Sequence, residues 1–173
     1  MIYSIRASIR ERVAPDHRLS CSSRLWRVLL HELARRGGGH RESGAFLLGK
    51  RLGGRRVIDG FICYDDLDPH CLDSGIVVFD GAGYGPLWQH CRKAQLEVAA
   101  DVHTHGGLAR QSAADRDHPM VATPGHVALI VPGFAQRLVD ARELGVYEYQ
   151  GEHRGQSYDV KAAGRFFNIG LWG

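Results

Sequence analysis

The sequence predicts a single α/β domain built on a mixed, mainly antiparallel sheet flanked by helices. Short apolar and β-branched runs alternate with amphipathic stretches along the 173 residues, and no repeat, low-complexity segment or linker interrupts them. The composition, 44% hydrophobic and 24% charged, is that of one compact domain with a sizeable core. We therefore expect residues 1–19 to be an N-terminal extension and residues 20–173 to be the core of the domain.

The first part of the chain predicts a helix followed by a β-hairpin. Ser22 or Ser23 is suited to cap a helix in which leucines and Trp26 recur at helical spacing, until a run of glycines ends it. Residues 44–50 and 55–66 are apolar and β-branched and are separated by a Gly-Gly pair, which indicates a hairpin.

The second part predicts one more helix and several short strands. The helix begins at Gly85 and Pro86, because proline is favoured in the first turn of a helix. It runs to about Ala94. We expect the apolar C-terminal segment to dock onto the core. The apolar runs that predict strands are residues 75–80, 96–103, 126–133 and 144–151.

Charge and cysteine content argue against several classes of protein. The formal net charge is only +3 and the basic residues are scattered, so nucleic-acid binding is not expected. The four cysteines form no Cys-x-x-Cys pair, and the N-terminus lacks the apolar core of a signal peptide. No run of about 18 apolar residues predicts a membrane span. We therefore expect a cytoplasmic protein that binds neither nucleic acid nor a membrane.

The segment from Val102 to Pro119 is the most informative, because an apolar strand ends there in His-Thr-His. Residues two apart on a strand point to the same face, so His103 and His105 present their imidazoles together. Such a pair is typical of a metal site, although histidine is also common where loops begin. Catalytic zinc takes three ligands from histidine and carboxylate and leaves a position for water. Asp115, ten residues after His105, is the candidate third ligand.

A hydrolase also needs a base for the proton of the attacking water and a donor that faces the developing oxyanion. Glu42, where the first predicted strand begins, is the candidate base, and Ser112 is the candidate donor. Each has an ordinary alternative. Ser112 and Asp115 also have the spacing of a capping box, and Glu42 taken alone is typical of a solvated surface.

Together these residues resemble the pattern of the JAB/JAMM metalloproteases, also called the MPN-plus domain. That family has a glutamate, a long gap, His-(Ser/Thr)-His and then Ser-x-x-Asp; this chain has Glu42, then "HTH" at residues 103–105, then "SAAD" at residues 112–115. The context "ESGAFLLG" is similar to the family's entry into its first strand. The resemblance extends from the first predicted helix to about residue 133.

The chain departs from the family pattern at two points. Six residues separate His105 from Ser112 where the family usually has seven, and Gly106 stands where proline is common. A surface loop tolerates a deletion of one residue, and the intact Ser-x-x-Asp spacing indicates that this pair moves as a unit. Asp117 and His118 compete with the last residue of that motif for the ligand role, and we favour the motif on spacing.

The resemblance implies a single MPN/JAB-like domain with cytidine-deaminase-like layering. It implies zinc bound by His103, His105 and Asp115 with one water, Glu42 as general base and then acid, and Ser112 as the group that stabilises the oxyanion. Members of the family cut peptide or isopeptide bonds after the C-terminal Gly-Gly of ubiquitin or ubiquitin-like proteins. Some bacterial members trim sulfur-carrier proteins or act in antiphage operons.

We therefore expect a zinc metallopeptidase that removes a ubiquitin-like modifier from its conjugate or processes its precursor, with a bacterial antiphage system as one setting. Only three of the 22 basic residues are lysine, which favours a bacterial source. The polar segment 65–85 is where we expect the substrate tail to pair with a sheet edge, or else an ordinary surface loop. The sequence does not predict the oligomeric state.

Other functions remain as alternatives. One is the trimming of a sulfur carrier, a second is a non-catalytic MPN scaffold, and a third is an unrelated His-x-His hydrolase for phosphoesters or small amides. A cysteine protease built on Cys71 or Cys91 with the adjacent histidine is disfavoured, because sequence neighbours do not face each other on a strand or a helix.

Overall fold

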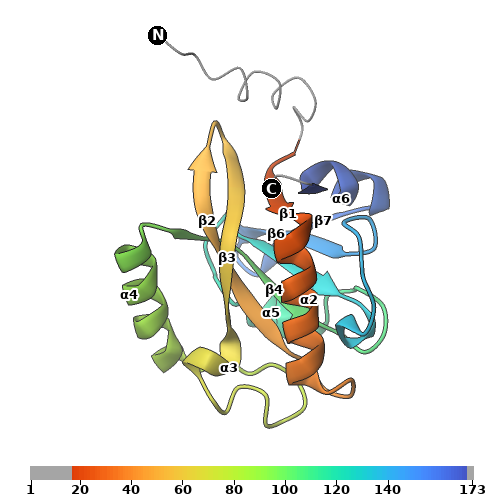
Figure 1. Cartoon of the computed structure of the whole chain (residues 1–173). Helices are drawn as coiled ribbons and strands as arrows, with labels where there is room; N and C mark the ends of the chain where they lie inside the picture. Colours follow the sequence, from red (N-terminus) through yellow and green to blue (C-terminus); the bar gives the residue numbers. More distant parts are fainter. Residues whose placement is uncertain (1–16, 171–173) are drawn as a thin grey trace.

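The computed structural model describes residues 17–170 as a mixed α/β fold around one curled, eight-stranded sheet (Figure 1). The strands are β1 (Leu19–Ser22), β2 (Gly44–Leu52), β3 (Arg55–Cys63), β4 (Glu97–Thr104), β5 (Val127–Val131), β6 (Gly145–Gly151), β7 (Arg154–Tyr158) and β8 (Phe167–Gly170). The helices are α2 (Ser23–Gly37), α3 (Tyr64–Leu67), α4 (Tyr84–Ala94), α5 (Ala113–Asp117) and α6 (Val160–Phe166), with short 3-10 turns η1 (Gly81–Gly83) and η2 (Gly133–Ala135).

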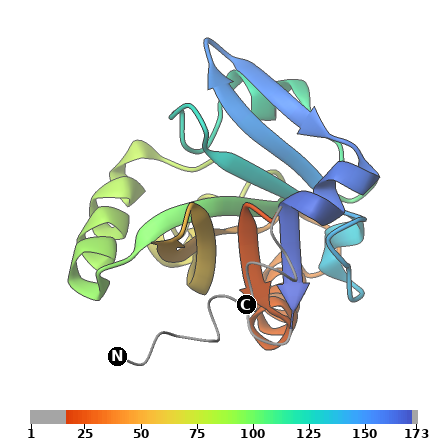
Figure 2. The same cartoon turned by 90° about the horizontal axis from the view of Figure 1, so that it is seen from above.

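The sheet is mixed, and its strand order is β7-β6-β5-β4-β2-β3-β1-β8. Strand β2 is antiparallel to both β3 and β4, and β6 is antiparallel to both β5 and β7. Strand β1 runs parallel to β3 and β8, and β4 runs parallel to β5. Seen from above, the blue β6–β7 hairpin rises away from the centre of the sheet (Figure 2). The antiparallel centre places the start of β2 beside the end of β4.

Helices pack on both faces of the sheet, and strand β2 shows this most directly. Successive side chains of a strand point to opposite faces. Ala45 and Leu47 therefore join a core that includes α2, whereas Phe46 and Leu48 join a second core that includes α4. All four side chains are buried, so β2 is a central strand covered on each side.

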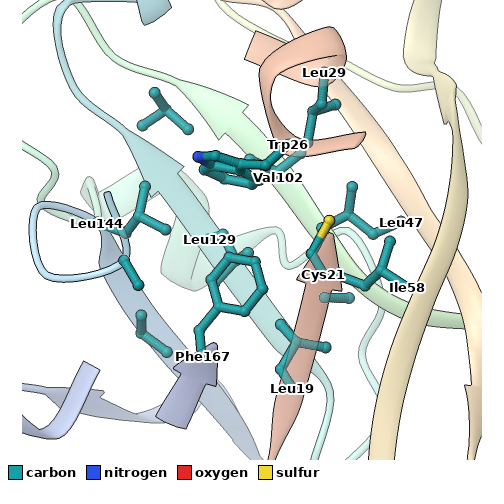
Figure 3. Close-up of a cluster of buried hydrophobic side chains, with 14 of the residues drawn as sticks. Leu19, Cys21, Trp26, Leu29, Leu47, Ile58, Val102, Leu129, Leu144 and Phe167 are labelled. Carbon is teal, nitrogen blue, oxygen red and sulfur yellow. The ribbon is translucent and has the colours of Figure 1, made fainter. Parts of the chain in front are cut away.

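The first core forms beneath α2. Ser22 caps this helix by accepting a hydrogen bond from the N–H of Leu25 at 3.2 Å. Trp26 lies edge-on to Phe167 with the ring centroids 5.3 Å apart (Figure 3). Its indole N–H donates to the carbonyl of Val139 at 2.7 Å. These contacts tie the helix to β8 and to the loop that precedes β6.

Several predicted elements are confirmed. Helix α2, the β2–β3 hairpin, helix α4 and strands β4, β5 and β6 lie where the sequence indicates, and α4 begins one residue before the expected Gly85. The C-terminal segment does dock, as α6 and β8, while residues 171–173 lie outside the described part. Strand β1 begins at Leu19, the last residue assigned to the N-terminal extension, most of which lies outside the described residues.

The strand predicted for residues 75–80 is wrong, because Gly75 and Ile76 form a bend and residues 77–80 join no sheet. Its apolar alternation is real, since Val77 and Phe79 pack into the second core while Ile76 and Val78 are 51% and 58% exposed. Its backbone bonds go elsewhere: the N–H of Val78 donates to the carbonyl of Cys71, and that of Asp80 to the carboxylate of Asp68. Alternation predicts a half-buried extended chain, and a strand also needs a partner.

Among residues 17–170, no helix has both the length and the apolar character that a membrane span requires.

Candidate metal and catalytic site

The predicted ligand pair lies at the end of a central strand. His103 on β4 is paired with Gly44 of β2 on one side and Ile130 of β5 on the other, and it is 6% exposed. Just beyond the end of β4, the chain makes one more hydrogen bond to β5, from the N–H of His105 to the carbonyl of Val131 at 2.9 Å. The backbone on both sides therefore fixes the position of the two imidazoles.

Three side chains converge to the spacing of a metal site. The Nε2 atoms of His103 and His105 are 3.1 Å apart, and the two carboxylate oxygens of Asp115 lie 3.4 Å and 3.5 Å from them, respectively. A tetrahedral zinc about 2.0–2.1 Å from each donor needs donors roughly 3.3 Å apart. Within the described residues this is the one group of at least three potential metal ligands that meets in this way. The donor set and its spacing fit zinc.

Asp115 is held in place by a capping box at the start of α5. The N–H of Ser112 donates to Oδ2 of Asp115 at 2.6 Å, and the N–H of Asp115 donates to the hydroxyl oxygen of Ser112 at 3.1 Å. The two interpretations of "SAAD" thus coexist, because the residue that completes the cap also reaches the histidines. The loop shortened by one residue still delivers Asp115 to them.

Asp115 and His103 stabilise each other's charged form. Burial opposes ionisation of Asp115, but its bonds to His103 and Ser112 outweigh this effect and hold the pKa of Asp115 below its usual value. Burial likewise disfavours the charged form of His103, but the bond and charge of Asp115 raise the pKa of His103. Nδ1 of His103 is buried and has no hydrogen-bond partner in the described chain. With Nδ1 protonated, the lone pair of Nε2 would face the cluster, as a metal ligand requires.

Glu42 faces the same cluster from the start of β2. One carboxylate oxygen, Oε1, lies 3.6 Å from Nε2 of His105, and the other accepts a hydrogen bond from the N–H of Val77 at 3.2 Å. The N–H of Glu42 also donates to the carbonyl of Gly75 at 2.9 Å. The segment 75–80 therefore holds Glu42, and this carboxylate is not the solvated surface group that its sequence context alone would suggest.

Two buried hydroxyl groups join Glu42 to the histidine pair, and the sequence analysis did not single them out. Oγ1 of Thr104 accepts from the N–H of Ser43 at 3.0 Å, while the N–H of Thr104 donates to the carbonyl of Ser43 at 2.9 Å. The hydroxyl of Ser43 donates to the carbonyl of Leu33 in α2 at 2.8 Å. Both residues are fully buried, so these two hydrogen bonds fix Glu42 relative to His103 and His105. The available sequence signal was the hydroxyl residue between the two histidines.

The glycine at position 106 has a structural reason. A Cβ atom on Gly106 would lie 2.5 Å from the ring of Phe134, so the phenyl ring occupies the space of a side chain there. The N–H of Phe134 donates to the carbonyl of His105 at 2.9 Å. Phe134 and the following Ala135 have φ angles of 52° and 57°, which non-glycine residues rarely adopt. The η2 turn thus packs directly against the loop that follows the histidine pair.

A cavity of about 550 Å³ opens beside the cluster. His103 and Asp115 lie in its wall, and it extends over β4, β5 and β6, where Asp101, His126 and Tyr147 line it. Ser112 is exposed and does not line it. The cavity therefore has two of the three potential metal ligands in its wall, whereas His105 and Glu42 lie outside its lining.

The competing candidates do not join this cluster. Asp117 is exposed, and His118 lines the cavity without meeting the other ligands. Cys71 is buried, which raises the pKa of its thiol to about 12, and Cys91 is also buried with its pKa raised for the same reason. A thiol in such a setting is a poor nucleophile at neutral pH, so the structure disfavours a cysteine protease.

No family model matches the chain. Among the solved structures that resemble it are two solution structures. The solution structure of a protein from Desulfitobacterium hafniense is 19% identical, with a TM-score of 0.60, and the match covers 82% of this chain and 90% of that one. The solution structure of a protein from Salinibacter ruber is 18% identical, with a TM-score of 0.50 and coverage of 77% and 86%. At these identities the likeness shows a shared fold and does not extend to chemistry.

Proposed function

We propose that the chain is a zinc-dependent peptidase or isopeptidase of the JAB/JAMM (MPN-plus) type. Its reaction would be hydrolysis of the bond after the C-terminal glycine of a ubiquitin-like modifier. One observation carries the proposal: His103, His105 and Asp115 converge at metal-ligand spacing, and Glu42 lies 3.6 Å from one of these ligands. A purely structural metal site would have no need of a free carboxylate beside it.

The metal supplies one part of the chemistry. His103, His105 and Asp115 would hold a zinc ion, which when bound would lower the pKa of a water from 15.7 to about 7 and polarise a carbonyl group. The remaining groups belong to the chain. Oε2 of Glu42 is occupied by the N–H of Val77, which leaves Oε1 directed at the cluster to take the proton of the attacking water. The same carboxyl group then gives this proton to the leaving amine.

Ser112 is the proposed oxyanion donor. Its oxygen accepts the N–H of Asp115, so its own hydroxyl hydrogen is not used by the capping box and is free to donate. Preorganised donors of this kind lower the barrier because they need no rearrangement as the negative charge develops. The exposed position of Ser112 at the start of α5 supports a role that begins when substrate covers it.

A glycine tail suits the surroundings of Glu42. The segment 75–80 lies next to this carboxylate and exposes the apolar side chains of Ile76 and Val78. A main chain without side chains can approach such a segment closely, whereas a bulkier tail would be held away from the metal ligands. We propose this segment as the wall along which the tail of the modifier lies.

Fold and setting form part of the same proposal. Helices on both faces of a mixed sheet are consistent with an MPN/JAB-like domain with cytidine-deaminase-like layering. Four free, buried cysteines are consistent with a reducing, cytoplasmic compartment. Sulfur-carrier trimming would use the same groups on a different tail. A non-catalytic MPN scaffold would leave the convergence of Glu42 with the ligands unexplained.

The decisive experiment measures zinc content and cleavage together. Wild type and Glu42→Gln are loaded with zinc and incubated with a fusion protein whose modifier ends in Gly-Gly, with and without a chelator. We expect cleavage after Gly-Gly in wild type alone, and equal zinc content in both proteins. Zinc without cleavage of any such fusion would contradict the peptidase proposal, and the absence of zinc would contradict the metal site.

A further inference from the structure

A second polar group lies in the floor of the cavity and has no part in the proposed chemistry. Nε2 of His126 is 2.6 Å from Oδ1 of Asp101, and the hydroxyl of Tyr64 donates to Oδ2 of the same carboxylate at 3.2 Å. Asp101 is 1% exposed, His126 8%, and Tyr64 is fully buried. A carboxylate and an imidazole at this depth are costly unless each is paired, and here they are.

This pair lines the same cavity as two of the potential metal ligands, His103 and Asp115. Asp101 and His103 are two residues apart on β4, so their side chains project from the same face, about 7 Å apart. His126 stands directly before β5, and Ala128 of β5 is paired with Asp101 across the sheet. Both members of the pair line the cavity, as does His103. The pair therefore lies within two residues of an extended chain from the bond that would be cut.

His126 offers the cavity a free hydrogen-bond acceptor. The carboxylate of Asp101 can only accept, so Nε2 of the neutral ring carries the hydrogen and Nδ1 is left with a lone pair. In the described chain no group bonds to Nδ1 of His126. This atom is nevertheless not completely buried. Nδ1 is therefore open to the cavity that His126 lines.

The position of the pair indicates which part of the substrate would contact it. Glu42 and the segment 75–80 lie on the β2 side of β4, whereas His126 comes from the β5 side. If the modifier tail follows the segment 75–80, the part of the substrate beyond the scissile bond passes over His126. This step rests on the proposed function, because it uses the direction of the tail.

We infer that Asp101 and His126 form a specificity subsite that binds a hydrogen-bond donor of the leaving-group side of the substrate, either a main-chain amide or an ammonium group. Asp101 orients the imidazole and supplies negative charge, and Nδ1 of His126 accepts the hydrogen bond. Tyr64 holds the carboxylate from below and makes no contact with the substrate.

Two substitutions separate this role from a purely structural one. His126→Gln keeps a polar group near the position of Nε2, facing Asp101, and loses the one that faces the cavity. His126→Asn keeps a polar group near the position of Nδ1 and loses the contact with Asp101. A binding role predicts that the glutamine variant is impaired for substrate, whereas a structural role predicts that only the asparagine variant is impaired, in stability.

The test uses the full chain carrying Glu42→Gln and loaded with zinc, so that peptides bind without being cut. The three probes are Gly-Gly peptides followed by lysine, by its uncharged analogue norleucine, or by norleucine with the next peptide bond N-methylated. We expect His126→Gln to bind the preferred probe about tenfold more weakly than its parent, and His126→Asn to bind within about threefold of it. Preference for lysine in the parent assigns the donor to an ammonium group, and discrimination against the methylated peptide assigns it to an amide.

The outcomes that overturn the inference are distinct. The parent protein carries Glu42→Gln alone. If it binds the three probes equally, or if adding His126→Gln leaves its affinity unchanged, a donor subsite is excluded. A parent that binds none of the probes would exclude it too. Binding with the expected preferences, together with a wild type that cuts none of the peptides, would leave the subsite standing and contradict the proposed function alone. Zinc content and melting temperature, measured on each variant, show whether the site itself is intact.

Discussion

The backbone N–H of Val77 donates to Oε2 of Glu42 at 3.2 Å, so a segment that forms no strand orients the proposed catalytic carboxylate. The bond occupies one oxygen and leaves Oε1 directed at His105. A glutamate has three rotatable side-chain bonds, and a fixed donor of this kind restricts it to the orientation that proton transfer needs. The segment 75–80, in which the N–H of Val77 is bonded to Glu42 and not to a strand, therefore has a role in the site.

Removal of this single N–H is expected to impair turnover and leave the metal in place. Val77→Pro lacks the donor, whereas Val77→Ala keeps it and loses only side-chain packing. We expect kcat to fall about tenfold or more in the proline variant relative to the alanine variant, with equal zinc content in both. A proline variant with the activity of its alanine control would show that Glu42 needs no such anchor.

Ser112 has two functions that one pair of substitutions can separate. Ser112→Ala removes both the cap of α5 and the free hydroxyl, whereas Ser112→Thr keeps both. We expect the alanine variant to lose about 1 kcal/mol of stability with the cap and about 10² to 10³ in kcat with the oxyanion donor. Denaturation and steady-state kinetics on the two variants check these values. A loss of stability with unchanged kcat would limit Ser112 to capping.

The buried bonds between Thr104 and Ser43 are expected to contribute to stability and to the placement of Glu42. Thr104→Val keeps the shape of the side chain but leaves the N–H of Ser43 without an acceptor, which costs about 1–3 kcal/mol. Thr104→Ser keeps the hydroxyl and is the matched control. Chemical denaturation should show the loss in the valine variant only, and a valine variant as stable as the serine variant would contradict it.

The sequence was most informative where a residue type has few structural uses. Two histidines with alternate spacing at a strand end predicted a shared face, and the geometry at His103 and His105 confirms it because strand periodicity is local. The capping box at Ser112 and Asp115 was also predictable, since its four residues are consecutive. The α/β class followed from alternating periodicities for the same reason.

Features that depend on long-range pairing were not predictable. Strands β1, β7 and β8 are short, and β7 is polar, so nothing in their local sequence distinguishes them from loops. They form because a neighbouring strand pairs with each of them: β1 lies between β3 and β8, and β7 and β8 are the two edge strands. The prediction for the segment 75–80 is wrong in the opposite way. Its apolar pattern is that of a strand, but no neighbouring strand pairs with it. The pairing of Asp101 with His126 joins residues 25 positions apart and left no motif in the sequence.

The contact between Gly106 and Phe134 predicts that a proline at position 106, as in the JAB/JAMM pattern that the sequence resembles, destabilises this chain. Gly106→Pro would force its ring into the phenyl group, whose backbone N–H also holds the carbonyl of His105. We expect a loss of about 1–3 kcal/mol and weaker zinc binding, both largely reversed when Phe134→Ala is added. A double-mutant cycle in which the two losses simply add would show that the contact does not matter.

An ion pair between the half-exposed Arg18 and the buried Glu148, which is not part of the metal-ligand cluster, predicts an acid-dependent loss of stability. The carboxylate of Glu148 accepts two hydrogen bonds from the guanidinium of Arg18, at 2.8 Å and 2.9 Å, and one from the hydroxyl of Tyr158. Burial opposes its ionisation, but the bonds from Arg18 and Tyr158 prevail and lower the pKa of Glu148. The unfolded chain therefore takes up the proton more readily than the folded one. The stabilising effect is complete above the unfolded pKa, about 4.3, and is lost as the pH falls through the lower folded value.

Glu148→Gln should remove this dependence. The amide keeps the size of the side chain and does not titrate, so the stability of the variant should change less than that of the wild type between neutral pH and about pH 3. Chemical denaturation as a function of pH, carried out on the zinc-free proteins so that metal release does not contribute, measures the difference. Because Arg18 is half exposed, added salt should reduce that difference only in part. Parallel stability curves for the two proteins across this range would show that Glu148 does not contribute through its charge.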